Sequence, residues 1–191
     1  MKKIFAMALA VAMMLTLLVA CGDKTPETQT PDVQVPASAE EILTNVWAQY
    51  PEDMWFPTVI GDPAALVEEP TYTWDMTNTE NMPYVLLIPQ DQIANVDDVA
   101  SAMHSMNANT YTCGVFHMAP GADAADFAET MRNAVQGNQW MCGFPEQLII
   151  ANIAGEYVMV AFGRNDAMNP FQTYFSAAYP EAQIVVNEPI A

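Results

Sequence analysis

Apolar residues recur at helical spacing in four stretches of the chain. This pattern predicts four helices, over residues 38–50, 95–106, 123–137 and 170–179. Ser38 and Glu41 form a capping box at the first helix, in which each side chain satisfies a backbone N–H group of the other residue. Asn95 and Asp123 are expected to cap the second and third helices, and Pro170 to occupy the first turn of the last.

Shorter runs of apolar and β-branched residues predict strands. They cover residues 72–74, 84–88, 109–118, 148–153, 157–162 and 183–186. The fourth and fifth runs flank Ala154-Gly155-Glu156, which is typical of a hairpin turn, and the last run is expected at a sheet edge. Helices and strands in this order predict an α+β domain, with a mainly antiparallel sheet and helices packed on one face.

The first 20 residues have the pattern of a secretory signal peptide. Lys2 and Lys3 precede an uncharged apolar run, and Ala20 is the small residue before Cys21. The run is shorter than the roughly 20 apolar residues that span a bilayer, which disfavours a permanent transmembrane helix. The segment from Leu18 to Cys21 resembles the lipobox of bacterial lipoproteins.

This resemblance implies that Cys21 receives a diacylglycerol group and becomes the N-terminus after cleavage. Because two acyl chains are enough for stable anchoring, the expected location is the cell membrane, on its extracytoplasmic face. Residues 21–36 then comprise the lipid-attachment cysteine and a flexible, proline-bearing linker, and residues 37–191 a single domain. The alternative is a signal peptide that is cleaved without lipidation.

Acidic residues dominate the charge of the chain. Beyond residue 20, three basic residues (Lys24, Arg132 and Arg164) face 23 acidic ones, which gives a net charge of −20. Nucleic acid is therefore excluded as a partner, since binding it requires clustered Lys and Arg. Residues 75–80 come nearest to a calcium-binding loop, but Glu80 stands where such a loop requires glycine.

Cys113 and Cys142 remain after the lipid-attachment cysteine. Outside the cytoplasm they can pair, and closing this loop would stabilise the fold by about 3.5 kcal/mol in the chain-entropy model. The alternative is two buried thiols that act as small apolar side chains. Their spacing in the sequence leaves both interpretations open.

No catalytic motif is visible in the sequence. The chain lacks a Gly-x-Ser-x-Gly elbow, a phosphate-binding glycine loop and a pair of histidines one helical turn apart. A pair formed by Cys113 or Cys142 with His104 or His117 is compatible with the sequence, because such groups need only be close in space. A cysteine in the middle of a strand is, however, more often inert packing than a nucleophile. We therefore expect that the chain is not an enzyme.

Met103, His104 and Met106, followed by His117 on the next predicted strand, offer thioether and imidazole groups of the kind that bind soft metals. The same methionines fall on the core face of the predicted helix, where packing is the simpler role. His104 in the last turn is well placed to contact free carbonyl groups. We therefore expect neither a metal nor another cofactor.

Trp55, Trp74 and Trp140 lie in irregular segments, outside the helical stripes. Tryptophans in loops can contact a ligand or anchor a protein partner, so these three are the candidate ligand-contact residues. The alternative is that they cover the open face of the sheet or the first helix.

Two stretches carry a further resemblance: MHSMNANTYTCGVFHMAPGADAADFAETMRNAV and QLIIANIAGEYVMVAFG. Together they are similar to a domain of unknown function in lipoproteins of clostridia-like bacteria. Those proteins share a lipobox, a linker, a helix opening with Ala-Glu-Glu-Ile and a terminal hairpin. The resemblance covers residues 38–179 and implies no catalytic residues.

The anchor, the linker and the missing catalytic motifs together predict a non-catalytic binding or adaptor domain at the cell surface, with an envelope protein as its partner. One alternative is a module that binds a carbohydrate or peptide through its tryptophan loops. Another is a hydrolase or thiol-dependent enzyme. A small-molecule binder should have a concave pocket, an adaptor an exposed apolar patch, and an enzyme a buried histidine or carboxylate at a cleft.

Overall fold

The computed structural model describes residues 35–56, 58–59, 71–106 and 110–191. Residues Val33–Ala191 form one compact unit. The predicted signal peptide, the lipid-attachment residue Cys21 and the linker up to residue 34 lie outside the described residues. None of the helices in the described ranges is long and apolar enough to cross a membrane.

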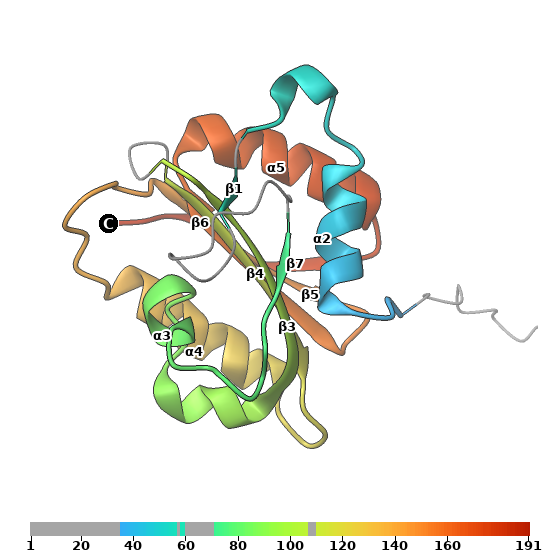
Figure 1. Cartoon of the computed structure of the whole chain (residues 1–191), viewed down its shortest axis with the longest axis vertical. Coiled ribbons are helices and arrows are strands. Elements are labelled where there is room, and N and C mark those ends of the chain that lie inside the picture. Colours follow the sequence, from blue (N-terminus) through green and yellow to red (C-terminus); the bar gives the residue numbers. More distant parts are fainter. Residues whose placement is uncertain (1–34, 57, 60–70, 107–109) are drawn as a thin grey trace, which may run out of the picture. The chain divides into compact units, whose positions relative to one another are not determined.

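An antiparallel sheet of seven strands forms the centre of the described domain (Figure 1). In chain order the strands are β1 (Thr58–Val59), β2 (Tyr72–Thr73), β3 (Val96–His104), β4 (Tyr111–Met118), β5 (Gln147–Ile153), β6 (Tyr157–Gly163) and β7 (Gln183–Pro189). Their spatial order is β1-β3-β4-β6-β5-β7. β2 pairs with the same edge of β3 as β1 does, but with different residues of that strand. The predicted hairpin is confirmed as β5 and β6, and the predicted edge strand as β7.

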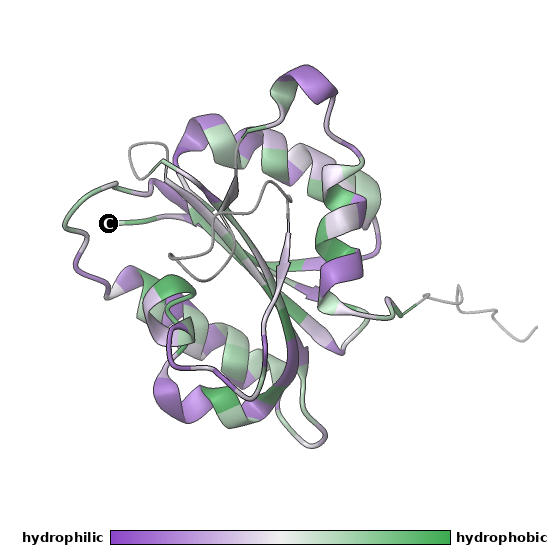
Figure 2. Cartoon of the chain, in the orientation of Figure 1, coloured by the Kyte–Doolittle hydropathy of each residue, from purple (hydrophilic) through white to green (hydrophobic). Residues whose placement is uncertain are grey.

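Helices cover both faces of this sheet (Figure 1). They are α2 (Ala39–Trp47), α3 (Met82–Val85), α4 (Ala124–Gln136) and α5 (Asn165–Ala178), with 3-10 turns η1 (Glu52–Met54) and η2 (Gln90–Asn95). α2 and α5 pack on one face, and α3 and α4 on the other. In Figure 2 hydrophobic residues (green) and hydrophilic residues (purple) both occur along α2 and α4, because only one side of each helix is buried. The predicted α+β class and antiparallel sheet are confirmed, but the helices are not confined to one face.

Burial of both faces of the sheet explains why its strands are apolar. Successive residues of β5 point to opposite faces, so that Ile149 lies in the core under α2 and α5, and Ile150 in the core under α4. The same alternation separates Met159 and Val160 on β6. A strand that is covered on both sides reads as a continuous apolar run rather than as alternating apolar and polar residues.

Local capping signals place two helices correctly. The Ser38 hydroxyl accepts a hydrogen bond from the Glu41 N–H (3.1 Å), and the Glu41 carboxylate accepts one from the Ala37 N–H (2.7 Å). The Asp123 carboxylate accepts hydrogen bonds from the first N–H groups of α4. The chain enters the domain at Pro36, whose carbonyl accepts a hydrogen bond from the Tyr157 hydroxyl (3.0 Å).

Three predicted elements differ from the structure. Residues 95–106, predicted as a helix, contain β3, because pairing with β4 buries both faces of this segment and overrides its helical pattern. Residues 84–88, predicted as a strand, contain the end of α3 and a turn in which Leu87 has a φ of 57°. α5 begins at Asn165 rather than at Pro170. The Asn165 N–H donates a hydrogen bond to the carboxylate of Glu146 (2.8 Å), which lies in a distant segment of the chain.

Candidate functional site

An open pocket of about 470 Å³ lies at the end of the sheet where β3 ends and β4 begins. Its walls come from α3 and the turn after it (residues 83–87), the end of β3 (103–106), the start of β4 (110–112), the loop after α4 (138–143) and Phe162 of β6. We call this cavity the apolar pocket. Its volume is within the usual range of binding sites for small molecules or for one or two side chains.

Large exposed apolar side chains belong to the wall of the apolar pocket or adjoin its wall residues in the sequence. Tyr84 is 81% exposed, Met106 53%, Met141 92% and Phe144 65%. Tyr84 and Met106 belong to the wall itself, and Met141 and Phe144 flank the wall residues Cys142 and Gly143. We call these four residues the apolar rim. Such a concentration of exposed apolar side chains around a cavity is typical of an interaction site.

The wall of the apolar pocket contains no Asp, Glu, Lys or Arg among its described residues. Its histidine, His104, is buried and stacks on Phe56, with ring centroids 4.9 Å apart. Burial lowers the pKa of His104, and the negative charge of Asp166 opposes this effect. The imidazole is therefore neutral at neutral pH, which leaves the pocket without a positive charge.

A hydrogen bond fixes the tautomer of His104. Its Nδ1 accepts from the Met106 N–H (3.0 Å), so that the proton of the neutral ring is carried by Nε2. A protonated nitrogen is a hydrogen-bond donor and not a metal ligand. Across the ranges that the structure describes, no group of three His, Cys, Asp or Glu side chains could hold a metal ion.

Two wall residues carry local strain or an unmet hydrogen bond. Leu87 has a positive φ of 57°, a conformation that costs a residue other than glycine of the order of 1 kcal/mol or more. The Trp140 ring packs on Phe162, with centroids 5.6 Å apart, and within the part of the chain that the structure describes its buried Nε1 has no hydrogen-bond partner. Strained and unsatisfied groups are more common at binding sites than elsewhere, which is consistent with a site here.

The three predicted ligand-contact tryptophans do not converge. Only Trp140 lines the apolar pocket. Trp74 is buried beside β3, where its Nε1 donates to the Ser101 hydroxyl (2.9 Å). Trp55 is exposed over the opposite face of the sheet, where it contacts the edge of the Trp47 ring. Trp74 therefore packs in the core, and Trp55 packs on the first helix, α2.

The two cysteines are free thiols in the structure, not a disulfide. Cys113 lies fully buried on β4, in the core under α2 and α5. Cys142 lies in the exposed loop that lines the apolar pocket. Burial raises the pKa of Cys113, so its thiol stays protonated and is not a nucleophile. No hydrogen bond joins Cys142 to His104, although both contribute to the pocket wall.

Alkylation should separate these thiols. In a chain that begins at residue 21 and carries Cys21→Ser, iodoacetamide is expected to label Cys142 in the native state and to spare Cys113. Unfolding in urea should then expose Cys113, so that mass spectrometry counts one label before unfolding and two after it. A protein without reductant that takes no label in urea would contain the disulfide and contradict the structure.

His117 lies at the opposite end of β4 from the apolar pocket. Its Nδ1 contacts the Asp97 carboxylate, and its Nε2 lies 3.7 Å from the Glu156 carboxylate. Asp97 stands where the pairing of β3 with β4 shifts register, and Glu156 is in the turn before β6. The histidine therefore joins two surface segments, and none of the three residues lines the apolar pocket.

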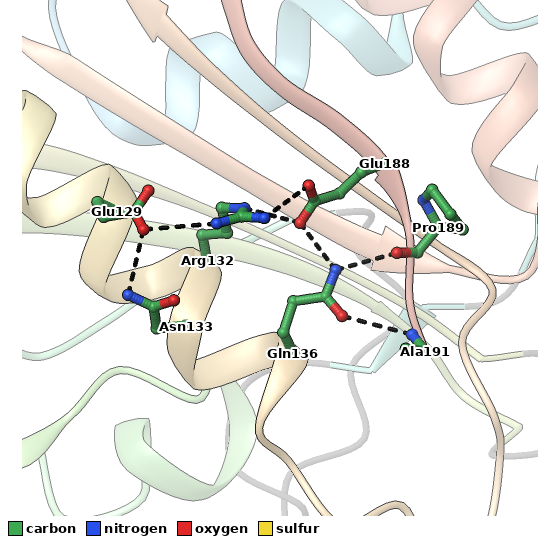
Figure 3. Close-up of polar contacts among 7 residues, drawn as sticks. All are labelled: Glu129, Arg132, Asn133, Gln136, Glu188, Pro189 and Ala191. Carbon is green, nitrogen blue, oxygen red and sulfur yellow. Dashed lines mark hydrogen bonds and ion pairs between the residues drawn. The ribbon is translucent and has the colours of Figure 1, made fainter.

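A cluster of polar side chains joins α4 to β7. Figure 3 shows Arg132 and Gln136 of α4 pointing toward Glu188. The Arg132 guanidinium donates to both Glu188 oxygens (2.8 and 2.9 Å), and the Gln136 amide donates to Glu188 (2.8 Å) and to the Pro189 carbonyl (3.0 Å). These hydrogen bonds hold the pKa of Glu188 below its usual value. Because both carboxylate oxygens are occupied, the cluster fixes the edge strand and is not free to bind a ligand.

The apolar rim was missed in the sequence. Tyr84 fell in a predicted strand and Met106 in a predicted helix, so both were interpreted as core residues. Met141 and Phe144 lie in residues 137–146, where apolar side chains stand between glycines and a proline and belong to no periodic element. Apolar residues outside any periodic pattern are the only local signal of this surface.

The comparisons with known proteins give no further assignment. No family model matches the chain, and neither a curated protein nor a solved structure matches it.

Proposed function

We propose that the chain is a lipid-anchored binding domain on the outer face of the membrane, and that it docks an apolar segment of an envelope protein in the apolar pocket. The observation that carries this proposal is the apolar rim around an uncharged cavity. A partner that inserts one side chain into the cavity would also cover the rim residues. Burying apolar surface of this kind contributes about 25 cal/mol per Å².

The rim favours a protein over a small molecule. A small ligand held inside the cavity would leave Met141 and Phe144 in water, because both are exposed and neither is among the wall residues. An extended or helical segment has an apolar anchor and flanking residues that can cover both. Central apolar anchors surrounded by weaker contacts are the usual arrangement in protein interfaces.

The charge of the chain favours a basic partner. A second copy of the chain would bring another net charge of −20 to the interface and be repelled. A segment rich in Lys or Arg would instead be attracted over a distance of about a Debye length, about 8 Å at physiological salt. The partner that best fits the surface is therefore a cationic envelope protein with an exposed apolar segment.

Photo-crosslinking in the cells that produce the protein tests this proposal. A photoreactive residue at position 141 of the full chain is expected to give one discrete adduct of protein mass. The same residue at position 185, an exposed valine on β7 away from the apolar pocket, is the matched control and should not give that adduct. Identical adducts at both positions, or an adduct of carbohydrate or lipid mass at position 141, would overturn the proposal.

A further inference from the structure

A second pocket shares a wall with the apolar pocket. Its volume is about 620 Å³, and it is lined by Thr77, Asn78, Thr79, Glu80 and Gln90, together with Pro83 and Tyr84. Pro83 and Tyr84 also line the apolar pocket. The exposed Tyr84 ring therefore stands between an uncharged cavity and a polar one, which we call the polar pocket.

Hydrogen bonds fix the shape of the polar pocket. The Asp75 carboxylate accepts from the Thr77 N–H (2.9 Å) and from its hydroxyl (2.7 Å), and the Asn78 N–H donates to the Asp75 carbonyl (2.8 Å). The Met82 N–H donates to the Thr79 carbonyl (3.1 Å), which joins this turn to α3. The polar wall and the Tyr84 side chain are thus held on one continuous segment.

Glu80 supplies the negative charge of the polar pocket. Its side chain is exposed, and within the described part of the chain it forms no ion pair. The hydrogen bonds from Thr77 hold the pKa of nearby Asp75 below its usual value, so Asp75 stays ionised at neutral pH. An ammonium or guanidinium group in this pocket would have a carboxylate partner and, in Tyr84, an aromatic ring beside it.

We infer that the two pockets form one composite site, which selects a peptide segment carrying a Lys or Arg close in sequence to its apolar anchor. The apolar side chain occupies the apolar pocket and the basic side chain reaches Glu80 across Tyr84. This inference rests on the proposed function and names the chemistry of the partner. Charge complementarity supports it twice, through Glu80 at the site and through the acidic excess of the whole chain.

Selection of random peptides displayed on phage tests the composite site. The target is the chain from residue 21 with Cys21→Ser, which retains the compact unit Val33–Ala191 whole. Selected peptides are expected to share an apolar residue and a Lys or Arg within a few positions of it. Peptide binding should weaken about tenfold in a variant with Met141→Ser and Phe144→Ser, which removes apolar rim contacts.

Glu80→Gln then isolates the second pocket. It should weaken binding of the basic-flanked peptides about threefold, as expected for an exposed ion pair, and the loss should shrink at high salt. Peptides with the basic residue replaced by norleucine should bind equally well to both forms. Glu181→Gln, an exposed carboxylate outside both pockets, is the matched control and should leave affinity unchanged.

The outcomes separate the inference from the proposed function. Peptides that need the apolar rim but show neither basic enrichment nor sensitivity to Glu80→Gln would overturn the composite site and leave the apolar docking site standing. Peptides that bind the rim variant as well as the native chain would overturn the docking site itself.

Discussion

Phe116→Ala is expected to lower the free energy of unfolding by about 3–5 kcal/mol. Phe116 is fully buried in the core under α4, where its ring contacts the edge of Phe127 at a centroid distance of 5.3 Å. Truncation removes apolar contacts and leaves a cavity that the surrounding strands and helix cannot close. For a domain of this size the melting temperature should fall by about 10 °C. Urea unfolding followed by circular dichroism measures the loss.

The exposed Phe144 provides the matched control for this experiment. Phe144→Ala removes the same ring from the apolar rim and should change stability by no more than about 0.5 kcal/mol. A loss below about 1 kcal/mol for Phe116→Ala would mean that the core around this ring is not packed as the structure shows.

Gly114 provides a second test of how the Phe116 ring packs. A Cβ added at Gly114 would lie 2.8 Å from the Cζ of Phe116, which is closer than real contacts allow. Gly114→Ala should therefore destabilise the native protein, and much less so in the Phe116→Ala background, where the ring is absent. We expect a coupling energy of about 1 kcal/mol or more in the double-mutant cycle. Strictly additive losses would contradict this packing.

Alkaline pH is expected to unfold the domain steeply above about pH 10. Burial, the largest cause for each, raises the pKa of Tyr50, Tyr111 and Cys113, which sit together in the core under α2 and α5. In the unfolded chain these phenols and the thiol lose protons near their ordinary values, about 10 and 8.5. The folded state retains these protons, so stability is fully present below the unfolded values and falls as pH rises towards the folded ones.

The size of this effect follows from proton linkage. Each group contributes a loss of about 1.4 kcal/mol per pH unit between its unfolded and folded pKa, so that three groups together give about 4 kcal/mol per unit. Urea unfolding at a series of pH values measures the slope. A stability that stays constant up to pH 11 would show that these groups ionise without unfolding.

Tyr50→Phe tests the assignment of the slope. The Tyr50 hydroxyl is buried and has no hydrogen-bond partner among the described residues, so its removal should raise stability at neutral pH by about 1 kcal/mol. The alkaline slope should also fall by about 1.4 kcal/mol per pH unit, because the contribution of one phenol is gone. Tyr84→Phe, at an exposed phenol, is the control that should change neither quantity.

The elements that the sequence predicted correctly are those with local signals. Ser38 and Asp123 cap their helices through side chains within three residues, and Gly155 with its positive φ marks the hairpin. β3 was missed because Val99 and Met103 are four residues apart, a spacing that a helix and a strand both satisfy. Only its long-range pairing with β4 decides between them, and that information is not local.

The site was harder to predict than the fold for a similar reason. Its walls come from separate segments, and each contributes a few residues with no motif of their own. Trp140 was identified because a large aromatic residue in a loop is unusual, but Tyr84 was hidden by a wrong strand prediction. A surface assembled from several segments gives no recognisable pattern in any one of them, whereas the sequence signal of a cap or a hairpin turn is contained within a few residues.

The hydrogen bond between Tyr157 and Pro36 also fixes where the first described residues of the chain lie relative to the apolar pocket. Tyr157 and Phe162 stand near opposite ends of β6, about 16 Å apart at a strand rise of about 3.3 Å per residue. Phe162 lines the pocket, whereas Pro36 lies beside Tyr157. The first described residues of the chain therefore lie at the opposite end of β6 from the pocket.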